Sequence, residues 1–173
     1  MPNRIDFHRY ALWLAWTASQ RSEARAILEN GDDEPRKVGA CVLEWETNRV
    51  LALGYNGFSS GFTPPSDFYR DRVKRVSHII HAETNALVYV PRGTAGLMAV
   101  TLAPCAGCAR QIVASGIPKV IYGEVHQDPT GIEILHFYGV EVIYLPLLPL
   151  LEDWVTPAVE AYLTLAANVE ARN

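Results

Sequence analysis

Two short segments carry the residues best suited to chemistry, 81–83 (HAE) and 104–108 (PCAGC). Zinc in proteins takes nitrogen and sulfur ligands, and a catalytic zinc has three protein ligands and one open position for water. His81, Cys105 and Cys108 supply such a set. At the start of a helix, two cysteines at this spacing share one face, where the helix N-terminus favours the thiolate form. The spacing therefore predicts a catalytic zinc site.

Glu83 follows the histidine so closely that it does not readily share the metal with it. Its carboxylate can instead reach the open, water-filled position. There it can take a proton from the zinc-bound water and return it to a substrate nitrogen. The pattern therefore predicts a hydrolytic deamination, in which the metal supplies hydroxide, Glu83 relays protons and ammonia leaves.

Two other interpretations of the cysteines stay open. A structural zinc normally has four protein ligands, and the fourth would have to be Cys41 or a distant histidine. Cys41 lies within a β-rich run, where a buried apolar thiol is the simpler interpretation. A redox-active Cys-x-x-Cys is the second alternative, and it leaves His81 and Glu83 unexplained.

The order His-x-Glu, then Pro-Cys-x-x-Cys, is the known signature of zinc deaminases. The chain resembles the cytidine and deoxycytidylate deaminase family over about residues 10–145, and its deoxycytidylate members most. The segments that carry the resemblance are 20–22 (QRS), 38–41 (VGAC), 54–58 (GYNGF), 81–86 (HAETNA), 101–109 (TLAPCAGCA) and 112–122 (IVASGIPKVIY). The resemblance implies hydrolysis of dCMP to dUMP and ammonia, a homo-oligomer and a place in the supply of dTTP precursors.

The resemblance also implies where a nucleotide binds. The Asn of the family's G-Y-N-G turn contacts the sugar, which makes Asn56 the first candidate. A turn with glycines on both sides lets a short amide approach a ligand closely, and glycines that only make a tight turn are the alternative. Arg21, in the family's recurrent Arg-Ser pair, is a candidate for the phosphate; the basic run 70–75 (RDRVKR) is another, or a solvated charged face. Further candidate contacts are Tyr55, Ala82, Pro104 and His126.

Family members are often regulated by dCTP and dTTP with Mg²⁺, so the resemblance implies a nucleotide effector here.

The chain departs from the family pattern at Ala106 and Gly107, where Asn-Glu is common, and at His126, near an expected Tyr. These departures leave other substrates open: a nucleoside, a free base such as cytosine or guanine, or tRNA adenosine. An inactive nucleotide-binding protein of the same fold is the alternative outside enzymes.

Composition limits the partners. The chain has 173 residues, a formal net charge of −4 and a pI of about 5.7. An acidic balance does not suit a protein that binds nucleic-acid backbone. No apolar run has the length of a membrane span, and the first residues lack the pattern of an export signal. We therefore expect a cytoplasmic protein with neither nucleic acid nor membrane as partner.

The elements that must position these residues follow from periodicity. Apolar residues recur at helical spacing over about 6–26, and two β-rich runs, 38–45 and 49–55, predict a hairpin. Residues 56–66, rich in Gly, Ser and Pro, predict an irregular segment; residues 67–77 are charged and yield no element. The remaining predictions are helices at 81–90, 105–115 and 130–138, strands at 98–102, 119–122 and 140–145, and an amphipathic helix at about 153–169. This order predicts one α/β domain over 1–173, a three-layer α/β/α sandwich with a mixed sheet, and the family resemblance implies that the sheet has five strands.

Overall fold

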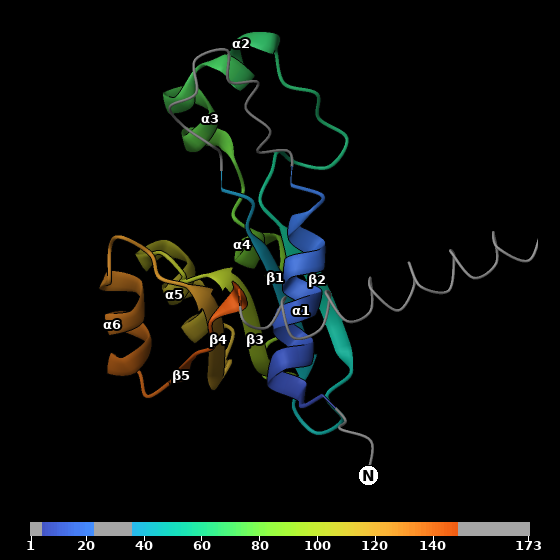
Figure 1. The fold of residues 1–173 in the computed structure, drawn as a ribbon, viewed down its shortest axis with the longest axis vertical. Coiled ribbons are helices and arrows are strands. Elements are labelled where there is room, and N and C mark those ends of the chain that lie inside the picture. The colour runs from blue at the N-terminus through green and yellow to red at the C-terminus, as the bar shows by residue number, and fades with distance from the viewer. Residues whose placement is uncertain (1–4, 23–35, 149–173) are drawn as a thin grey trace, which may run out of the picture.

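The computed structural model of the chain describes residues 5–22 and 36–148. In chain order its elements are α1 (Phe7–Ser19), β1 (Gly39–Glu44), β2 (Val50–Tyr55), α2 (Ser66–Arg70), α3 (Arg72–His78), α4 (Ala82–Leu87), β3 (Ala95–Leu102), α5 (Ala106–Ala114), β4 (Lys119–Glu124), α6 (Thr130–Phe137) and β5 (Glu141–Tyr144) (Figure 1). None of the helices in the described residues is long and apolar enough to cross a membrane.

The strands form a five-stranded sheet in the order β2-β1-β3-β4-β5. β1 pairs antiparallel with β2 and with β3, whereas β3, β4 and β5 run parallel. A tight turn suffices for the antiparallel hairpin, while each parallel pair needs a crossover, and α5 and α6 provide these crossovers. The predicted mixed sheet of five strands is therefore confirmed.

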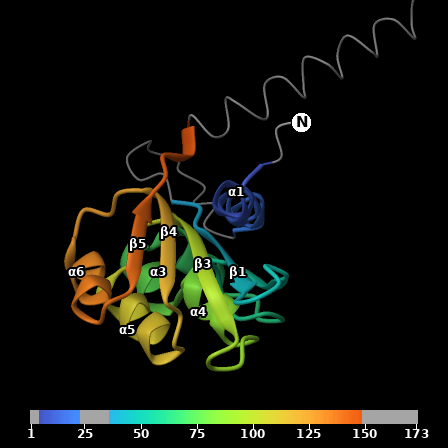
Figure 2. The same ribbon diagram turned by 90° about the horizontal axis from the view of Figure 1, so that it is seen from below.

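The sheet lies between two helical layers (Figure 2). α1 covers one face, and α4, α5 and α6 cover the other. Successive strand residues point to opposite faces, so Val42 packs toward α4, α5 and α6 while Leu43 packs toward α1. Val120 and Ile121 divide between the two hydrophobic clusters in the same way. This arrangement confirms the predicted three-layer α/β/α sandwich.

The first helix is shorter than the sequence predicts, since α1 ends at Ser19 and residues 20–22 are not helical. The Ser19 hydroxyl donates to the main chain of the preceding turn (2.6 Å), and the Ser22 hydroxyl donates to Asn56 (2.6 Å). Serine side chains that bond the main chain or a neighbouring segment compete with helix continuation. The remaining part of the prediction, residues 23–26, lies outside the described residues.

Between β2 and α4 the chain forms an arm of two short helices, α2 and α3, which projects beyond the sheet (Figure 1). The sequence yields no element here because helices of five and seven residues are too short to show a periodic apolar face. Asp71 caps α3 by accepting from the Lys74 amide (3.1 Å), and the Lys74 ammonium pairs with Asp67 (2.6 Å). Local polar contacts therefore support the arm.

Two further helix predictions remain. One is longer than the observed helix α4, and the other cannot be compared with the structure. α4 ends at Leu87 rather than at residue 90, because the chain turns tightly before Pro91. The amphipathic helix predicted at about 153–169 lies outside the described residues. One domain over 1–173 therefore stays a prediction.

Candidate metal centre

The predicted ligands stand at the starts of two helices. His81 is the N-cap residue of α4 and Cys105 that of α5. Neither side chain caps its own helix, so both are available to groups outside it. Cys105 follows the carboxyl end of β3, the end of a parallel strand at which α/β proteins bind their ligands. The fold thus directs both residues to one edge of the sheet.

The three ligand atoms are arranged as a zinc ion requires. The Nδ1 atom of His81 lies 3.5 Å from Sγ of Cys105 and 3.4 Å from Sγ of Cys108. All three atoms lie within 4.8 Å of one another. A tetrahedral zinc with bonds of about 2.0 Å to nitrogen and about 2.3 Å to sulfur separates these atoms by roughly 3.5 Å. The donor set and its spacing therefore fit zinc with three protein ligands.

The three side chains shift one another's pKa. Hydrogen bonds from Cys108 and His81 lower the pKa of Cys105 to about 3. Hydrogen bonding to Cys105 raises the pKa of Cys108 and also that of His81. Cys105 is therefore a thiolate at neutral pH, which is the form of cysteine that binds a metal.

Glu83 lies in the first turn of α4 and is only 3% exposed. Burial raises the pKa of its carboxyl, and the carboxyl hydrogen-bonds the Cys108 thiol. A buried carboxyl with a raised pKa, held beside a metal ligand, can accept and return a proton near neutral pH. Glu83, which the sequence predicts to be the proton carrier, therefore has the burial and the raised pKa that suit this role.

Cys41 does not belong to this cluster. It is fully buried in β1 and packs in the hydrophobic cluster on the α1 face of the sheet. The metal centre lies at the starts of α4 and α5, which cover the opposite face. Burial raises the pKa of the Cys41 thiol to about 12. Among the described residues, then, Cys41 is not a fourth ligand, which argues against a structural zinc.

Comparison with known proteins agrees with this geometry. Residues 13–124 match the family model described as the cytidine and deoxycytidylate deaminase zinc-binding region. The chain belongs to this family. The matched stretch contains the three candidate ligands and the buried carboxyl, and the resemblance inferred from the sequence is confirmed.

Named relatives identify the chain as a deaminase of the hydrolase class. A deoxycytidylate deaminase of Mycobacterium phage D29 is 35% identical over 136 residues, which cover 69% of this chain and 96% of the relative. The deoxycytidylate deaminase of Homo sapiens is 28% identical over 127 residues, 68% of this chain and 65% of the relative. A solved dCMP deaminase from the cyanophage S-TIM5, in complex with dCMP and dUMP, superposes with a TM-score of 0.61 at 27% identity, over 82% of this chain and 100% of that one.

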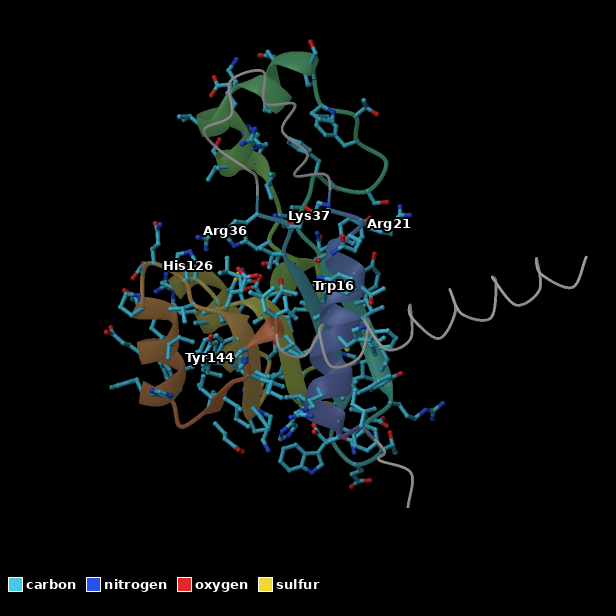
Figure 3. All side chains as sticks on the ribbon, in the orientation of Figure 1. Trp16, Arg21, Arg36, Lys37, His126 and Tyr144 are labelled. Atoms are coloured by element: carbon cyan, nitrogen blue, oxygen red, sulfur yellow. The ribbon has the colours of Figure 1, made fainter. Side chains whose placement is uncertain are left out.

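Two of the candidate substrate residues of this deaminase lie together. The Arg21 guanidinium carbon is 5.9 Å from the centroid of the Tyr55 ring. Ala82 and Pro104 are both fully buried. His126 lies in the loop between β4 and α6, where its Nδ1 atom accepts from the Asp128 amide (3.0 Å) (Figure 3).

The side chain of Asn56 is engaged mainly with the protein. Its Oδ1 atom accepts from the Ser22 hydroxyl (2.6 Å) and the Val38 amide (2.9 Å). Its Nδ2 group donates to the Arg36 carbonyl (2.9 Å), which leaves one amide hydrogen for another partner. Asn56 therefore connects the segments at residues 22 and 36–38 to the turn after β2, a role that the sequence did not indicate.

Two glycines, Gly54 and Gly131, set the position of the centre through close helix packing that the sequence does not predict. A Cβ atom on Gly54 would lie 2.2 Å from the Ala82 carbonyl oxygen, and one on Gly131 would lie 1.8 Å from that of Pro104. Gly54 therefore allows α4 to pack on β2, where Asn85 donates to the Tyr55 carbonyl (2.7 Å). A glycine inside a strand pattern often marks such a close approach, which is the signal that could have identified Gly54.

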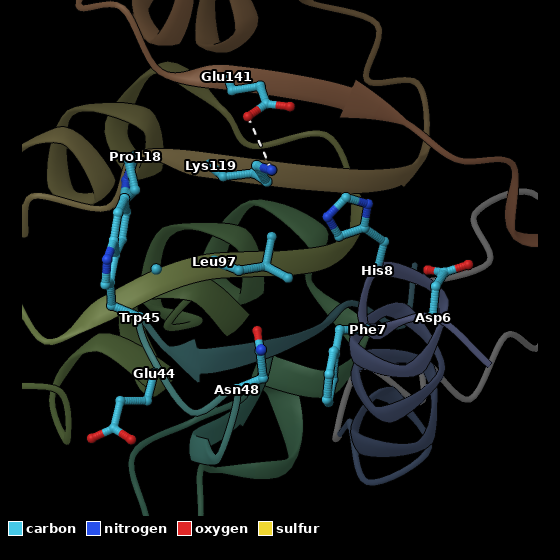
Figure 4. A pocket seen from close by; sticks show the side chains of 11 residues that line it. Asp6, Phe7, His8, Glu44, Trp45, Asn48, Leu97, Pro118, Lys119 and Glu141 are labelled. Carbon is cyan, nitrogen blue, oxygen red and sulfur yellow. Dashed lines mark ion pairs between the residues drawn. The ribbon is translucent and has the colours of Figure 1, made fainter. Parts of the chain in front are cut away.

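A cavity of about 450 Å³ lies at the opposite end of the sheet, where β3, β4 and β5 begin (Figure 4). Phe7 and Trp45 contribute aromatic walls, and Lys119 and Glu141 form an ion pair of 3.0 Å at its edge. None of the predicted site residues lines this cavity. It is therefore separate from the metal centre.

Proposed function

We propose that the chain hydrolyses dCMP to dUMP and ammonia, with zinc held by His81, Cys105 and Cys108 and with Glu83 as the proton carrier. One observation carries this proposal. A nitrogen and two sulfur atoms at zinc-binding distances stand at the starts of two helices, beside a buried carboxyl with a raised pKa. That arrangement supports hydrolytic removal of an amino group rather than a purely structural metal site.

His81, Cys105 and Cys108 would hold a zinc ion, which would supply a water of lowered pKa as the nucleophile near neutral pH. Glu83 takes a proton from water onto a carboxyl oxygen, and burial favours this neutral form. The same carboxyl then donates this proton to N3 of the pyrimidine as the water oxygen adds to C4. It next moves the remaining proton of that oxygen to the amino group, so that C4 becomes a carbonyl as the C4–N bond breaks and ammonia leaves. The main chain at Ala82 and Cys105 supports the edge of the base.

The choice of dCMP draws on the relatives. The phage D29 relative is named a deoxycytidylate deaminase and aligns with almost its full length. The cyanophage structure holds dCMP and dUMP. We propose that the substrate contacts comprise Arg21, Tyr55, Asn56, Ala82, Pro104 and His126. The pairing of Arg21 with Tyr55 supports a nucleotide site at the G-Y-N-G turn.

The proposals for regulation and for assembly also rest on the similarity to this family. We expect dCTP to activate and dTTP to inhibit the enzyme with Mg²⁺, and we expect a cytoplasmic homo-oligomer that supplies dTTP precursors. Equilibrium binding of dTTP in the presence of Mg²⁺ tests the effector site. An absence of saturable binding apart from the active site would contradict regulation.

An ammonia-release screen tests the substrate. The zinc-loaded protein is assayed with dCMP, dCTP, CMP, deoxycytidine, cytosine and guanine, each with and without dCTP and Mg²⁺. We expect the highest kcat/KM for dCMP. A higher value for a free base or a nucleoside would replace dCMP as the substrate, and release from none of them would contradict deamination of these compounds.

A further inference from the structure

We propose that Thr84 and Gln111 form a positioning pair that fixes the spacing between the two helices that bear the metal ligands. The Thr84 hydroxyl, on α4, donates to the Oε1 atom of Gln111, on α5, at 2.8 Å. The inference rests on the proposed function, because it adds to the proposed zinc site the residues that hold its ligands in place. Hereafter "the pair" means these two residues.

The pair repeats, one helical turn later, the contact between the metal ligands. Thr84 is three residues after His81, and Gln111 is three residues after Cys108. Residues at this spacing are neighbours on a helix surface. The Nδ1 atom of His81 and Sγ of Cys108 lie 3.4 Å apart, and the pair spans the same two helices further from the metal centre. A change in helix spacing at the pair is therefore passed on to the ligands.

The helix α4 has few means of its own to hold a fixed position. It has six residues, and its N-cap residue His81 makes no side-chain capping bond. Isolated helices of this length are not stable in water. The buried residues of α4 are Ala82, Glu83 and Ala86, so it contributes only two small apolar side chains and one carboxyl to the interior. The position of α4 therefore depends on contacts with neighbouring elements.

The contacts of α4 differ between its two sides. Toward β2, the close approach at Gly54 and the hydrogen bond from Asn85 to the Tyr55 carbonyl (2.7 Å) hold it firmly. Toward α5, the loop after α4 bonds the far end of α5, from the Gly93 amide to the Ser115 carbonyl (3.1 Å). Between that link and the metal centre, the pair is the one side-chain hydrogen bond that joins α4 to α5 in the described part of the chain.

The pair acts on the metal through helix spacing and not by direct contact. Its hydrogen bond joins the two side chains to each other rather than to a ligand. Ligands that are already held at the required spacing bind a metal more tightly, because less conformational freedom is lost on binding. Glu83 directly precedes Thr84, and its carboxyl hydrogen-bonds the Cys108 thiol. The pair therefore positions the proton carrier together with the ligands.

Transfer of zinc from the full-length, zinc-loaded protein to a chelator of known affinity tests the pair. T84V removes the hydroxyl and keeps a branched side chain, and Q111M removes the amide and keeps the length. We expect each variant to raise the Kd for zinc about two- to tenfold, the range for one hydrogen bond that is partly exposed to water. The double variant should match the single variants, because all three lose the same bond.

Two control variants and a second measurement separate positioning from folding. T84S keeps the hydroxyl and should restore the affinity of the wild type. T17V is the matched control, because the Thr17 hydroxyl bonds the Trp13 carbonyl within α1 (3.0 Å), and we expect no change. With Co²⁺ in place of zinc, visible absorption reports the ligand geometry. It should change in T84V and Q111M and stay as in the wild type in both controls, while thermal unfolding checks the fold.

The outcomes distinguish the pair from the proposed function, because neither measurement needs turnover. Unchanged zinc affinity in T84V and Q111M, additive losses in the double variant, or an equal loss in T17V would overturn the pair. Unchanged cobalt spectra beside a weakened affinity would overturn its positioning role. The expected losses in a protein that releases no ammonia from dCMP would retain the pair and reject the proposed reaction, whereas a wild type that binds no zinc would contradict both.

Discussion

The Nδ1 atom of His81 lies 3.4 Å from Sγ of Cys108, although the two residues are 27 positions apart in the chain. The separation matches that of two ligands on one tetrahedral zinc ion, which is about 3.5 Å. Two features of the fold produce it: α4 and α5 begin at the same edge of the sheet, and Gly54 lets α4 pack directly on β2. The geometry of the metal centre therefore depends on how the sheet and helices pack, because neither short motif alone brings the ligand atoms together.

The first prediction concerns metal content. Replacing Cys108 by Ala removes one of three ligands, so the purified protein should hold much less than one zinc per chain and should lose ammonia release. Metal analysis by mass spectrometry measures the stoichiometry. Cys41→Ala is the matched control, because Cys41 packs on the other face of the sheet and should leave zinc bound. Full zinc content in Cys108→Ala would contradict the assigned ligand set.

The second prediction separates proton transfer from metal binding. Glu83→Gln keeps the shape of the side chain but cannot accept the proton, and general acid–base groups contribute about 10²- to 10⁴-fold to rate. We expect ammonia release from dCMP to fall at least about 100-fold, with one zinc per chain retained. Unchanged turnover would refute the role of Glu83, and loss of zinc would show that its carboxyl is needed to hold the metal.

The grouping of the candidate ligands His81, Cys105 and Cys108 could be predicted from the sequence because most of its pattern is local. Cys105 and Cys108 share one helical turn, and Glu83 follows His81 closely, so spacing alone indicates a metal and a proton carrier. The alternation of strands and helices likewise defined the sheet, because each crossover contains a helix with an apolar face. Short-range sequence patterns were therefore sufficient to predict the fold class and the residues of the candidate site.

The role of Asn56 could not be predicted in this way. Its side chain bonds residues that are 34, 18 and 20 positions away, and no local spacing encodes such contacts. The same holds for Gly131, whose need to be glycine arises from the Pro104 carbonyl on a different segment. The helices α2 and α3 escaped prediction because they are too short for periodicity. What the sequence could not reveal is mainly tertiary contact between distant segments.

The third prediction concerns pH and Cys41. Burial raises its pKa from 9.0 to about 12 in the folded protein. Between these values the unfolded chain loses the thiol proton while the folded chain keeps it, so ionisation favours unfolding. The free energy of unfolding should therefore fall more steeply from pH 9 toward pH 12 in the wild type than in Cys41→Ala, by up to about 1.4 kcal/mol per pH unit.

Urea unfolding of both proteins at a series of pH values measures this difference, since groups other than Cys41 titrate alike in the two. Below pH 8 the two curves should run parallel. A pH-independent difference over the whole range would show that Cys41 ionises as readily in the folded as in the unfolded chain.

The last prediction contrasts two glycines near the metal centre. Gly131→Ala would place a methyl group 1.8 Å from the Pro104 carbonyl oxygen, so the start of α6 must move away from the segment that leads to Cys105. Overpacking of this kind costs about 1–3 kcal/mol, and the displaced ligand should also weaken zinc binding. Gly107→Ala is the matched control in α5, because the nearest atom to its new methyl group, Sγ of Cys105, is 3.8 Å away. In a helix this change adds up to about 1 kcal/mol of stability. Chemical unfolding and zinc competition against a chelator measure both effects, and a destabilised Gly107→Ala beside an unaffected Gly131→Ala would contradict the packing described for the two helices.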